Sequence, residues 1–342
     1  MSNSILTIRD IADLCGVSVA TVSRVMNQKP DVSPRTRKQV EEVIARFHFV
    51  GNASARDLKQ TSHDVIGILV RGRSNPFLNT LSEELLSLTD RLPYDFVTEY
   101  IDEKENEFDA ALRMISQKPV IGLIFVGSHL DRSSLPVEEI TVPTVFSTVS
   151  AADTCFSGAS SVSVDDHRMA FDATTALLTR GHRHIAVFGA TAESSGLFSD
   201  RYRGICDALA AFNLPVDPSL FRECRFSLKD GYQAAHAFFS VHPEVTALFA
   251  MNDSIAAGAI RALGDFGLSC PRDVSVIGYD GLEICDYLVP RLSTVVQPVR
   301  EIASESIRLL LDRIEHQAAP THVILDASLA LRESVRTLEE SL

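Results

Sequence analysis

The chain has 342 residues, of which 45% are apolar and 23% charged; these values are typical of folded globular proteins and exclude wholesale disorder. The longest apolar runs, such as residues 120–127, are far shorter than the roughly 20 residues that span a bilayer, and residues 1–15 lack the basic start and apolar core of an export signal. The six cysteines form no CxxC pair and no spacing typical of zinc ligands, so we expect reduced thiols, no metal site and a cytoplasmic protein.

Charge is distributed unevenly along the chain, whose overall net charge is −13. Residues 1–60 contain nine Lys or Arg and six Asp or Glu, a net charge of +3, whereas the remainder contains 23 and 39, a net charge of −16. This asymmetry predicts a basic head on an acidic body, in which only the head is suited to approach phosphate groups.

Three short helices are predicted in the first 50 residues, over about 8–15, 19–26 and 34–47. Thr7, Ser18 and Ser33 stand directly before them and have the side-chain oxygens that cap helix N-termini. Pro34 suits the first position of the third helix, and Gly16 can adopt the positive φ of the turn after the first. Apolar residues recur at helical spacing in each segment, which predicts one small three-helix domain.

Beyond a linker at residues 51–63, strand-like and helical segments alternate. The strand-like runs are 66–70, 94–100, 122–127, 144–148, 184–189, 246–251 and 274–280. The helical segments are 77–91, 104–117, 166–180, 200–212, 229–241, 253–267 and 298–316. This alternation predicts parallel, doubly wound sheets, and a region of this length usually forms two similar lobes around a ligand cleft at the carboxyl ends of the strands.

Residues 8–27, IRDIADLCGVSVATVSRVMN, have the pattern of a helix-turn-helix. Ala12 is small where two helices cross, and Val17 and Val22 hold the second helix on the first. The outward side chains are then Ser18, Val19, Ala20, Thr21, Ser23 and Arg24. Hydroxyls and a helix N-terminus suit phosphates, small apolar groups suit thymine methyls, and Arg suits guanine or phosphate. A three-helix protein-interaction domain, with Ser and Thr acting only as caps, is the alternative.

This stretch resembles the lactose/galactose-repressor (LacI/GalR) family, in which the second helix enters the major groove of DNA. The resemblance implies that Val19 and Ala20 are the main base readers. It further implies base or backbone contacts from Thr7, Ser18, Thr21, Ser23, Arg24 and Asn27.

The linker resembles the hinge helix of the same family, which folds only on operator DNA. The resemblance implies DNA contacts from Asn52, Ala55, Leu58 and Lys59. Leu58 would enter the central minor groove as an apolar wedge, although on its own it also fits an ordinary linker helix. Gly51 stands where the family usually has proline, and Asp57 adds a negative charge beside DNA, so both depart from the pattern.

Six further motifs match the family in order along the chain. They are 75–77 (NPF), 181–186 (GHRHIA), 201–204 (RYRG), 252–253 (ND), 273–280 (DVSVIGYD) and 292–298 (LSTVVQP). The implied fold is an N-terminal all-α helix-turn-helix domain over residues 1–50 and a hinge over 51–62. An α/β, two-lobed effector-binding and dimerisation domain with parallel sheets, similar to periplasmic sugar-binding proteins, follows over 63–342, with chain crossovers near 164, 294 and 326.

The same resemblance implies a set of effector contacts. They are Pro76, Phe77, Asp165, Arg201, Phe226, Asn252 and Asp280. Asp280 follows a strand and can accept hydrogen bonds from sugar hydroxyls, Arg201 and Asn252 supply donors, and the ring of Phe226 can stack on a sugar or base. Asp280 as a turn cap and Phe226 as a core residue remain alternatives.

Two departures concern the chemistry of the effector. Thr148 stands where sugar-binding relatives often have Asp or Asn, which argues against a simple neutral hexose. Arg71 and Arg73 follow the first strand of the body, and we hypothesise that one of them favours an anionic effector; the alternative is two solvated loop arginines. His182-Arg183-His184 fits a helix-to-strand turn better than a metal site, because no carboxylate or cysteine is suitably spaced.

Two other classes of protein fit an α/β body less well. A periplasmic-type binding protein is opposed by the missing export signal and by the basic head. An enzyme is opposed by the lack of GxxxxGK[ST], GxGxxG, HExxH and GxSxG motifs, and the adjacent acids Asp165 and Asp166 have no positioned nucleophile. We therefore expect no catalysis and no cofactor.

The expected function is a DNA-binding transcriptional regulator, foremost a repressor, controlled by a sugar, sugar phosphate or other metabolite. The expected partners are double-stranded operator DNA, this small-molecule effector and a second copy of the chain, with no membrane. Tetrameric relatives carry an extra C-terminal helix with leucine heptads, whereas this sequence stops at Leu342, so we expect a homodimer. Whether the effector induces or corepresses is left open.

Overall fold

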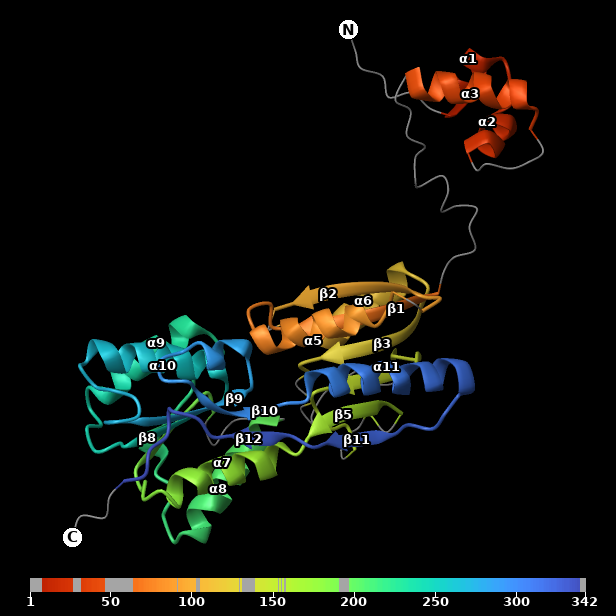
Figure 1. The fold of residues 1–342 in the computed structure, drawn as a ribbon. Helices are drawn as coiled ribbons and strands as arrows, with labels where there is room; N and C mark the ends of the chain where they lie inside the picture. Colours follow the sequence, from red (N-terminus) through yellow and green to blue (C-terminus); the bar gives the residue numbers. More distant parts are fainter. Residues whose placement is uncertain are drawn as a thin grey trace. The chain divides into compact units, whose positions relative to one another are not determined.

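The computed structural model describes residues 8–26, 32–46, 64–90, 92–102, 105–128, 130, 139–152, 154, 156, 158–190 and 197–338. The chain divides into two compact units, Met1–His63 and Asp64–Leu342, which are described separately (Figure 1). We call the first unit the head and the second the body.

Over residues 8–26 and 32–46, the head forms the helices α1 (Ile8–Cys15), α2 (Val19–Met26) and α3 (Pro34–Arg46), which confirms the three predicted helices. Their core consists of Ile11, Ala12, Cys15, Val22, Val25 and Val40. The Ser18 hydroxyl accepts a hydrogen bond from the backbone N of Thr21 (3.1 Å), as expected of a helix cap. Gly16 has φ +60°, and Val17 N donates to Ala12 O at 3.0 Å, so the turn directs α2 across α1.

The first lobe of the body is built on a parallel six-stranded sheet in the order β11-β5-β4-β3-β1-β2. Its strands are β1 (Val65–Arg71), β2 (Asp95–Ile101), β3 (Val120–Val126), β4 (Thr144–Ser147), β5 (Ser160–Val164) and β11 (His322–Leu325). Helices α5 (Pro76–Ser87) and α11 (Val299–His316) cover one face, and α6 (Glu107–Gln117) covers the other. Alternate residues of β1 therefore enter different apolar clusters, as strand geometry requires.

The second lobe repeats this design with the sheet order β12-β10-β9-β8-β6-β7. Its strands are β6 (Ile185–Phe188), β7 (Phe221–Arg222), β8 (Ala247–Ala250), β9 (Ser275–Asp280), β10 (Ser293–Val296) and β12 (Ser328–Ala330). Helices α7 (Asp166–Leu178) and α8 (Leu197–Ala211) pack on one face, and α9 (Leu228–Phe239) and α10 (Asp253–Asp265) on the other. Only β12 runs antiparallel to its neighbour in the described sheet.

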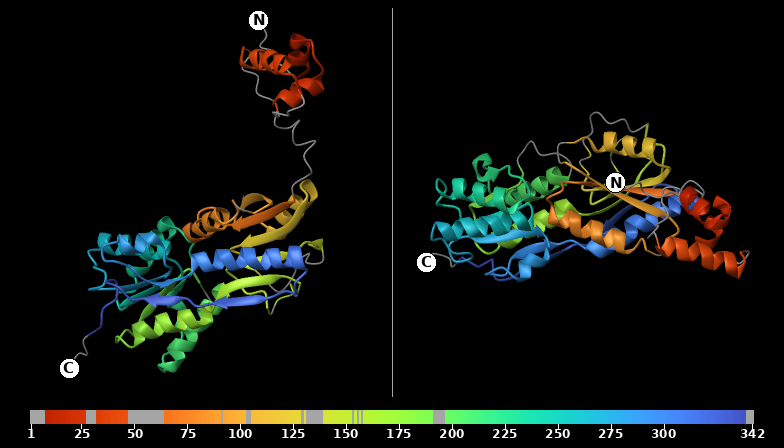
Figure 2. Two further views of the ribbon diagram at one scale, coloured as in Figure 1. Left: turned by 45° about the vertical axis from the view of Figure 1, so that its right-hand side comes forward. Right: turned by 90° about the horizontal axis from the view of Figure 1, so that it is seen from above.

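The chain passes between the lobes three times: from β5 to α7, from β10 to α11, and from β11 to β12. Figure 2 shows the two lobes side by side in both views. The arrowheads of β2 and β3 point toward the second lobe in Figure 1. Because β10 leads directly into the first lobe, its carboxyl end and those of its parallel neighbours also lie at the lobe boundary. Ligands of open α/β sheets bind at such strand ends. The predicted fold class is confirmed.

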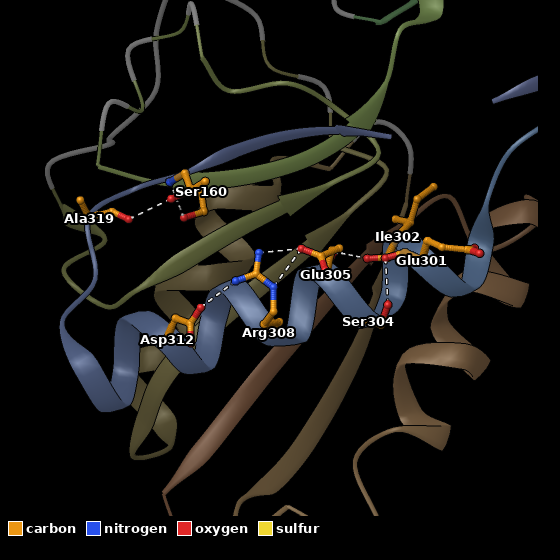
Figure 3. A network of polar contacts seen from close by, with 10 residues as sticks. Ser160, Glu301, Ile302, Ser304, Glu305, Arg308, Asp312 and Ala319 are labelled. Carbon is orange, nitrogen blue, oxygen red and sulfur yellow. Dashed lines mark hydrogen bonds and ion pairs between the residues drawn. The ribbon is translucent and has the colours of Figure 1, made fainter. Parts of the chain in front are cut away.

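Strand β5 was not predicted, because its sequence, Ser-Ser-Val-Ser-Val, is rich in serine. All five residues are nevertheless buried. The Ser161 hydroxyl accepts a hydrogen bond from Ala151 N (3.0 Å), and the Ser160 hydroxyl accepts one from Thr321 N (3.1 Å; Figure 3). Backbone donors of neighbouring segments thus satisfy the hydroxyls, which allows a polar strand inside the sheet.

Helix α11 belongs to the first lobe although it follows the second in sequence. On its exposed side, Arg308 forms ion pairs with Glu305 (2.6 Å) and Asp312 (2.8 Å), as Figure 3 shows. Such exposed pairs contribute little to stability. The opposite side packs on the sheet, where the hydroxyls of Ser306 and Ser147 are 2.6 Å apart. Packing of this inner face therefore fixes the position of the helix.

Candidate DNA-binding and effector sites

The N-terminal half of α2 presents the side chains predicted to contact DNA. Ser18, Val19 and Ala20 are exposed, whereas Val22 and Val25 on the other side of the helix are buried. Thr21 and Ser23 are half-buried and Arg24 is exposed. Of the remaining predicted DNA contacts, Thr7, Asn27, Asn52, Ala55, Leu58 and Lys59 lie outside the described residues. In the described part of the head, this helix face thus presents both polar and small apolar side chains, as recognition of a DNA groove requires.

In the second lobe, Arg201 is the centre of a buried polar cluster. This residue of α8 is 5% exposed, and its Nε donates to Asp166 Oδ1 at 2.7 Å. Its Nη1 donates to Met251 O at 2.8 Å, and its guanidinium carbon lies 3.5 Å from the centre of the Tyr279 ring. The Tyr279 hydroxyl donates to the same Asp166 oxygen (2.8 Å). These contacts fix the guanidinium in one orientation.

The charges in this cluster compensate one another. Burial raises the pKa of Asp166, and Arg201 and the Tyr279 hydroxyl oppose the rise. Burial alone would lower the pKa of Arg201, but the nearby Asp166, Tyr279 and Asp280 groups outweigh it and raise that pKa. Arg201 therefore stays charged, as a buried cation with bound partners can.

Asp280, the last residue of β9, is buried beside this cluster. Its φ of +108° lies in a region that side-chain-bearing residues rarely adopt, and such strain is typical of functional sites. Gln297 Nε2 donates to Asp280 Oδ1 at 2.9 Å. Burial raises the pKa of Asp280 well above its usual range, while Arg201 opposes the shift. The carboxyl group thus lies near a fixed cation, at the carboxyl end of a strand.

Asn252 adds a donor close to both. It caps α10, and its Oδ1 accepts a hydrogen bond from Ile255 N at 2.9 Å. Its Nδ2 is buried without a hydrogen-bond partner among the described residues. Leaving a buried donor unpaired costs about 1–3 kcal/mol, so this amide is a polar group whose acceptor is not among the described residues.

The first lobe contributes two buried hydroxyls that are also unpaired within the described ranges: those of Ser128, after β3, and Thr148, after β4. Thr148 has φ +82°. A side chain on Gly127 would come within 3.3 Å of Arg71 O, so the ends of β1 and β3 lie close together. From the sequence, Thr148 stands out only as a departure from the family pattern, and Ser128 does not stand out at all. The available signal was a polar residue directly after a buried strand.

The other predicted effector residues have different surroundings. Phe77 is buried in the first-lobe core, and exposed Pro76 precedes it at the start of α5. Asp165 is exposed and caps α7, where its Oδ1 accepts from Arg168 N at 2.9 Å. Phe226 is half-buried beside both second-lobe clusters, and Arg71 is half-buried at the end of β1. The structure therefore brings together Arg201, Asn252 and Asp280, but not the whole predicted set.

The sequence His182-Arg183-His184 lies between α7 and β6, as predicted for a helix-to-strand turn. The buried His182 ring contacts Thr246 Oγ1 (3.0 Å) and Arg336 O (3.1 Å), and burial lowers its pKa. Across the described residues, no three His, Cys, Asp or Glu side chains are grouped so as to hold a metal ion. None of the helices described is long and apolar enough to cross a membrane.

Comparison with known proteins assigns both units. Residues 7–52 match the family model described as bacterial regulatory proteins, lacI family, and residues 174–335 match the model of a periplasmic binding protein-like domain. The HTH-type transcriptional regulator MalR of Clostridium butyricum is 32% identical over 332 residues, which cover 96% of this chain and 99% of MalR.

Solved structures are similar over nearly the full length. The transcriptional regulator CelR in complex with cellobiose is 28% identical with a TM-score of 0.70, covering 96% of this chain and 99% of that one. The lac repressor dimer bound to operator and the anti-inducer ONPF is 26% identical with a TM-score of 0.70, covering 97% and 99%. The chain therefore belongs to the lacI family of bacterial regulatory proteins, and it is a DNA-binding transcriptional regulator.

Proposed function

We propose that this regulator represses transcription as a homodimer on a near-palindromic operator, and that a sugar or sugar derivative bound at Arg201, Asn252 and Asp280 controls its affinity for DNA. The buried, unpaired amide of Asn252 beside this fixed cation and carboxyl group is the observation that carries the proposal.

The chemistry of these three side chains supports a hydroxyl-rich effector. The guanidinium of Arg201 and the amide of Asn252 donate hydrogen bonds, and the carboxyl group of Asp280 accepts them. Neighbouring hydroxyls of a sugar ring both donate and accept, so they match such a set. Phe226 is half-buried against the second-lobe clusters, and its ring is the aromatic side chain we expect to stack on a sugar ring. The CelR structure contains cellobiose, which is consistent with this class of effector.

The first lobe favours a negatively charged variant of this effector. Residues 71–75, 127–128 and 148–150, which follow β1, β3 and β4, contain two arginines and no acidic residue. Arg73 Nε donates to Tyr100 O at 3.2 Å, and the hydroxyls of Ser128 and Thr148 remain available to an acceptor. Hydroxyl and guanidinium groups suit phosphate or carboxylate oxygens. A sugar phosphate or sugar acid is therefore the second candidate.

On DNA, we infer that α2 enters the major groove, with Val19 and Ala20 against base edges and Ser18, Thr21, Ser23 and Arg24 around them. Two heads of a dimer then read two half-sites. The second lobe has an exposed apolar segment at Ile284, Tyr287 and Val289, with Val289 92% exposed. Exposed apolar patches often mark surfaces that another protein covers. This patch therefore supports a contact with a second copy of the chain.

The experiment selects duplexes that bind the full-length protein from a random pool and measures binding at fixed salt. Matched sugars with and without a phosphate group are then tested for release or tightening of the selected operator. Sedimentation of the wild type and Val289→Ser tests the dimer. Lack of preference for any duplex would contradict DNA recognition, whereas operator binding that no metabolite alters would contradict only the effector site.

A further inference from the structure

Asp253 follows Asn252 directly, but its carboxyl group serves a different part of the second lobe. The residue is fully buried at the start of α10. Its Oδ1 accepts a hydrogen bond from the Thr294 hydroxyl on β10 (2.6 Å), and its Oδ2 accepts one from the backbone N of Leu282 (2.8 Å). A side chain on Gly278 of β9 would overlap with Oδ1. The carboxyl group therefore packs directly against the backbone of this glycine.

The segment that Asp253 holds is the turn after β9. Asp280 and Gly281 have consecutive positive φ angles of +108° and +77°. Gly281 N donates to the Thr294 hydroxyl at 3.3 Å, and this hydroxyl in turn donates to Asp253. The carboxylate therefore fixes residues 280–282 both directly and through Thr294. A buried network in which each group has a partner is rigid.

The two ends of this short turn have different neighbours. Asp280 lies at the effector site beside Arg201 and Gln297. Leu282, two residues later, packs against the second-lobe cluster beneath α9 and α10 and also against the first-lobe cluster beneath α5 and α11. Two peptide units therefore connect Asp280 to an apolar contact between the lobes.

Stability alone does not account for a carboxyl group at this position. Burial raises the pKa of Asp253 to about 6, which reflects the cost of keeping its charged form away from water. An apolar side chain would avoid that cost, but it would leave the amide of Leu282 without its acceptor and the hydroxyl of Thr294 with only the longer bond to Val295 O (3.3 Å). The carboxylate is therefore suited to holding a defined conformation.

We infer that Asp253 is the positioning residue that couples the effector site at Asp280 to the contact between the lobes through Leu282. The inference rests on the proposed effector site. It concerns the transmission of the signal, and it adds Asp253, Thr294 and Leu282 to the residues that control the response.

Amide hydrogen exchange of the full-length protein, without DNA or effector, tests this coupling. Asp253→Asn loses one acceptor and should speed exchange about fivefold or more in residues 281–286 and also in α5 and α11. Thr294→Val should have the same pattern at smaller amplitude. Leu282→Ala should speed exchange in α5 and α11. The backbone amide of residue 282, which still donates to Asp253, should remain protected from exchange.

Asp265→Asn, the same change at the exposed end of α10, is the matched control and should alter neither region. Faster exchange confined to residues 281–286 in Asp253→Asn would overturn the coupling, and unchanged exchange in these residues would overturn the positioning role of Asp253. If Asp253→Asn does not fold, Thr294→Val and Leu282→Ala decide by the same criteria. Because the assay contains no sugar and no DNA, failure of the proposed function in the metabolite test is distinguished from failure of this inference.

Discussion

The two lobes have the same order of strands but different chemistry where those strands end. In the second lobe, Arg201, Asp166, Tyr279 and Asp280 form a connected network of buried charges and hydrogen bonds. In the first lobe, the ends of β1, β3 and β4 carry hydroxyls without described partners, and residues 71–75, 127–128 and 148–150 contain no acidic residue. The same architecture therefore presents mostly paired charges on one side, with the amide of Asn252 left unpaired among the described residues, and unpaired hydroxyls on the other.

This difference indicates a division of roles. Groups already fixed by their neighbours lose little entropy when a ligand binds, so the second lobe is expected to supply most of the affinity. Hydroxyls that gain partners only in the complex are expected to draw the first lobe toward the ligand and to discriminate between ligands. Three substitutions test this division, and a fourth prediction concerns the stability of the second lobe.

Arg201→Gln should have the largest effect, because it leaves Asp166 buried without its cation. Breaking a buried ion pair in this way typically costs about 3–5 kcal/mol of unfolding free energy. Urea unfolding measures the loss, and effector binding should disappear with it. Arg203→Gln, two positions along α8 but exposed, is the control and should change stability little. Equal effects of the two variants would contradict the central role of Arg201.

Asp280→Asn should leave the fold intact, because asparagine tolerates positive φ. It should still weaken effector binding by about 10- to 100-fold, the usual range for a hydrogen bond to a charged group. Calorimetry with the effector found in the metabolite test gives the value. Asp286→Asn, six residues later on the exposed 3-10 helix Glu283–Asp286, provides the control. Unchanged affinity in Asp280→Asn would exclude it as a contact.

Thr148→Val should affect stability and binding in opposite directions. Removing a buried hydroxyl without a partner should raise the unfolding free energy by up to about 1 kcal/mol, and the lost contact should weaken effector binding by up to about tenfold. Ser128→Ala should behave similarly. Loss of stability in both variants would mean that these hydroxyls already have partners in the absence of ligand, and the contrast between the lobes would fail.

The pH response of His182 should be the smallest effect, and it concerns the stability of the second lobe alone. Burial lowers its pKa in the folded protein, so the unfolded chain binds the proton first. Stability should therefore fall as pH decreases below about 6.5, the usual histidine value. Urea midpoints at several pH values, compared between the wild type and His182→Gln, isolate this contribution. If the stability of the variant depends on pH in the same way as that of the wild type, the dependence comes from other titratable groups.

The sequence predicts the helices of the head and the α/β alternation of the body because these depend on local periodicity. Strand β5 escapes prediction because its serines are paired by residues outside the strand, Ala151 and Thr321, the second of which lies 161 positions from its partner Ser160. The residues of the candidate site likewise divide into those that local motifs identify and those that only long-range contacts reveal. Family motifs identify Arg201, Asn252 and Asp280, but the link between Asp166 and Tyr279 joins residues 113 positions apart. Such contacts arise from the topology and leave no local pattern.

The last strands of the two sheets, β11 and β12, are consecutive in the chain, and Ala327 between them packs against the cores of both lobes. During synthesis, residues 8–46 emerge early enough to form the head at once, whereas each lobe lacks an edge strand until residues 322–330 have left the ribosome. A chain that is stalled or cleaved before this point would carry a folded head together with two incomplete sheets whose edges are exposed. Such intermediates are prone to aggregation, so the two lobes should complete folding together.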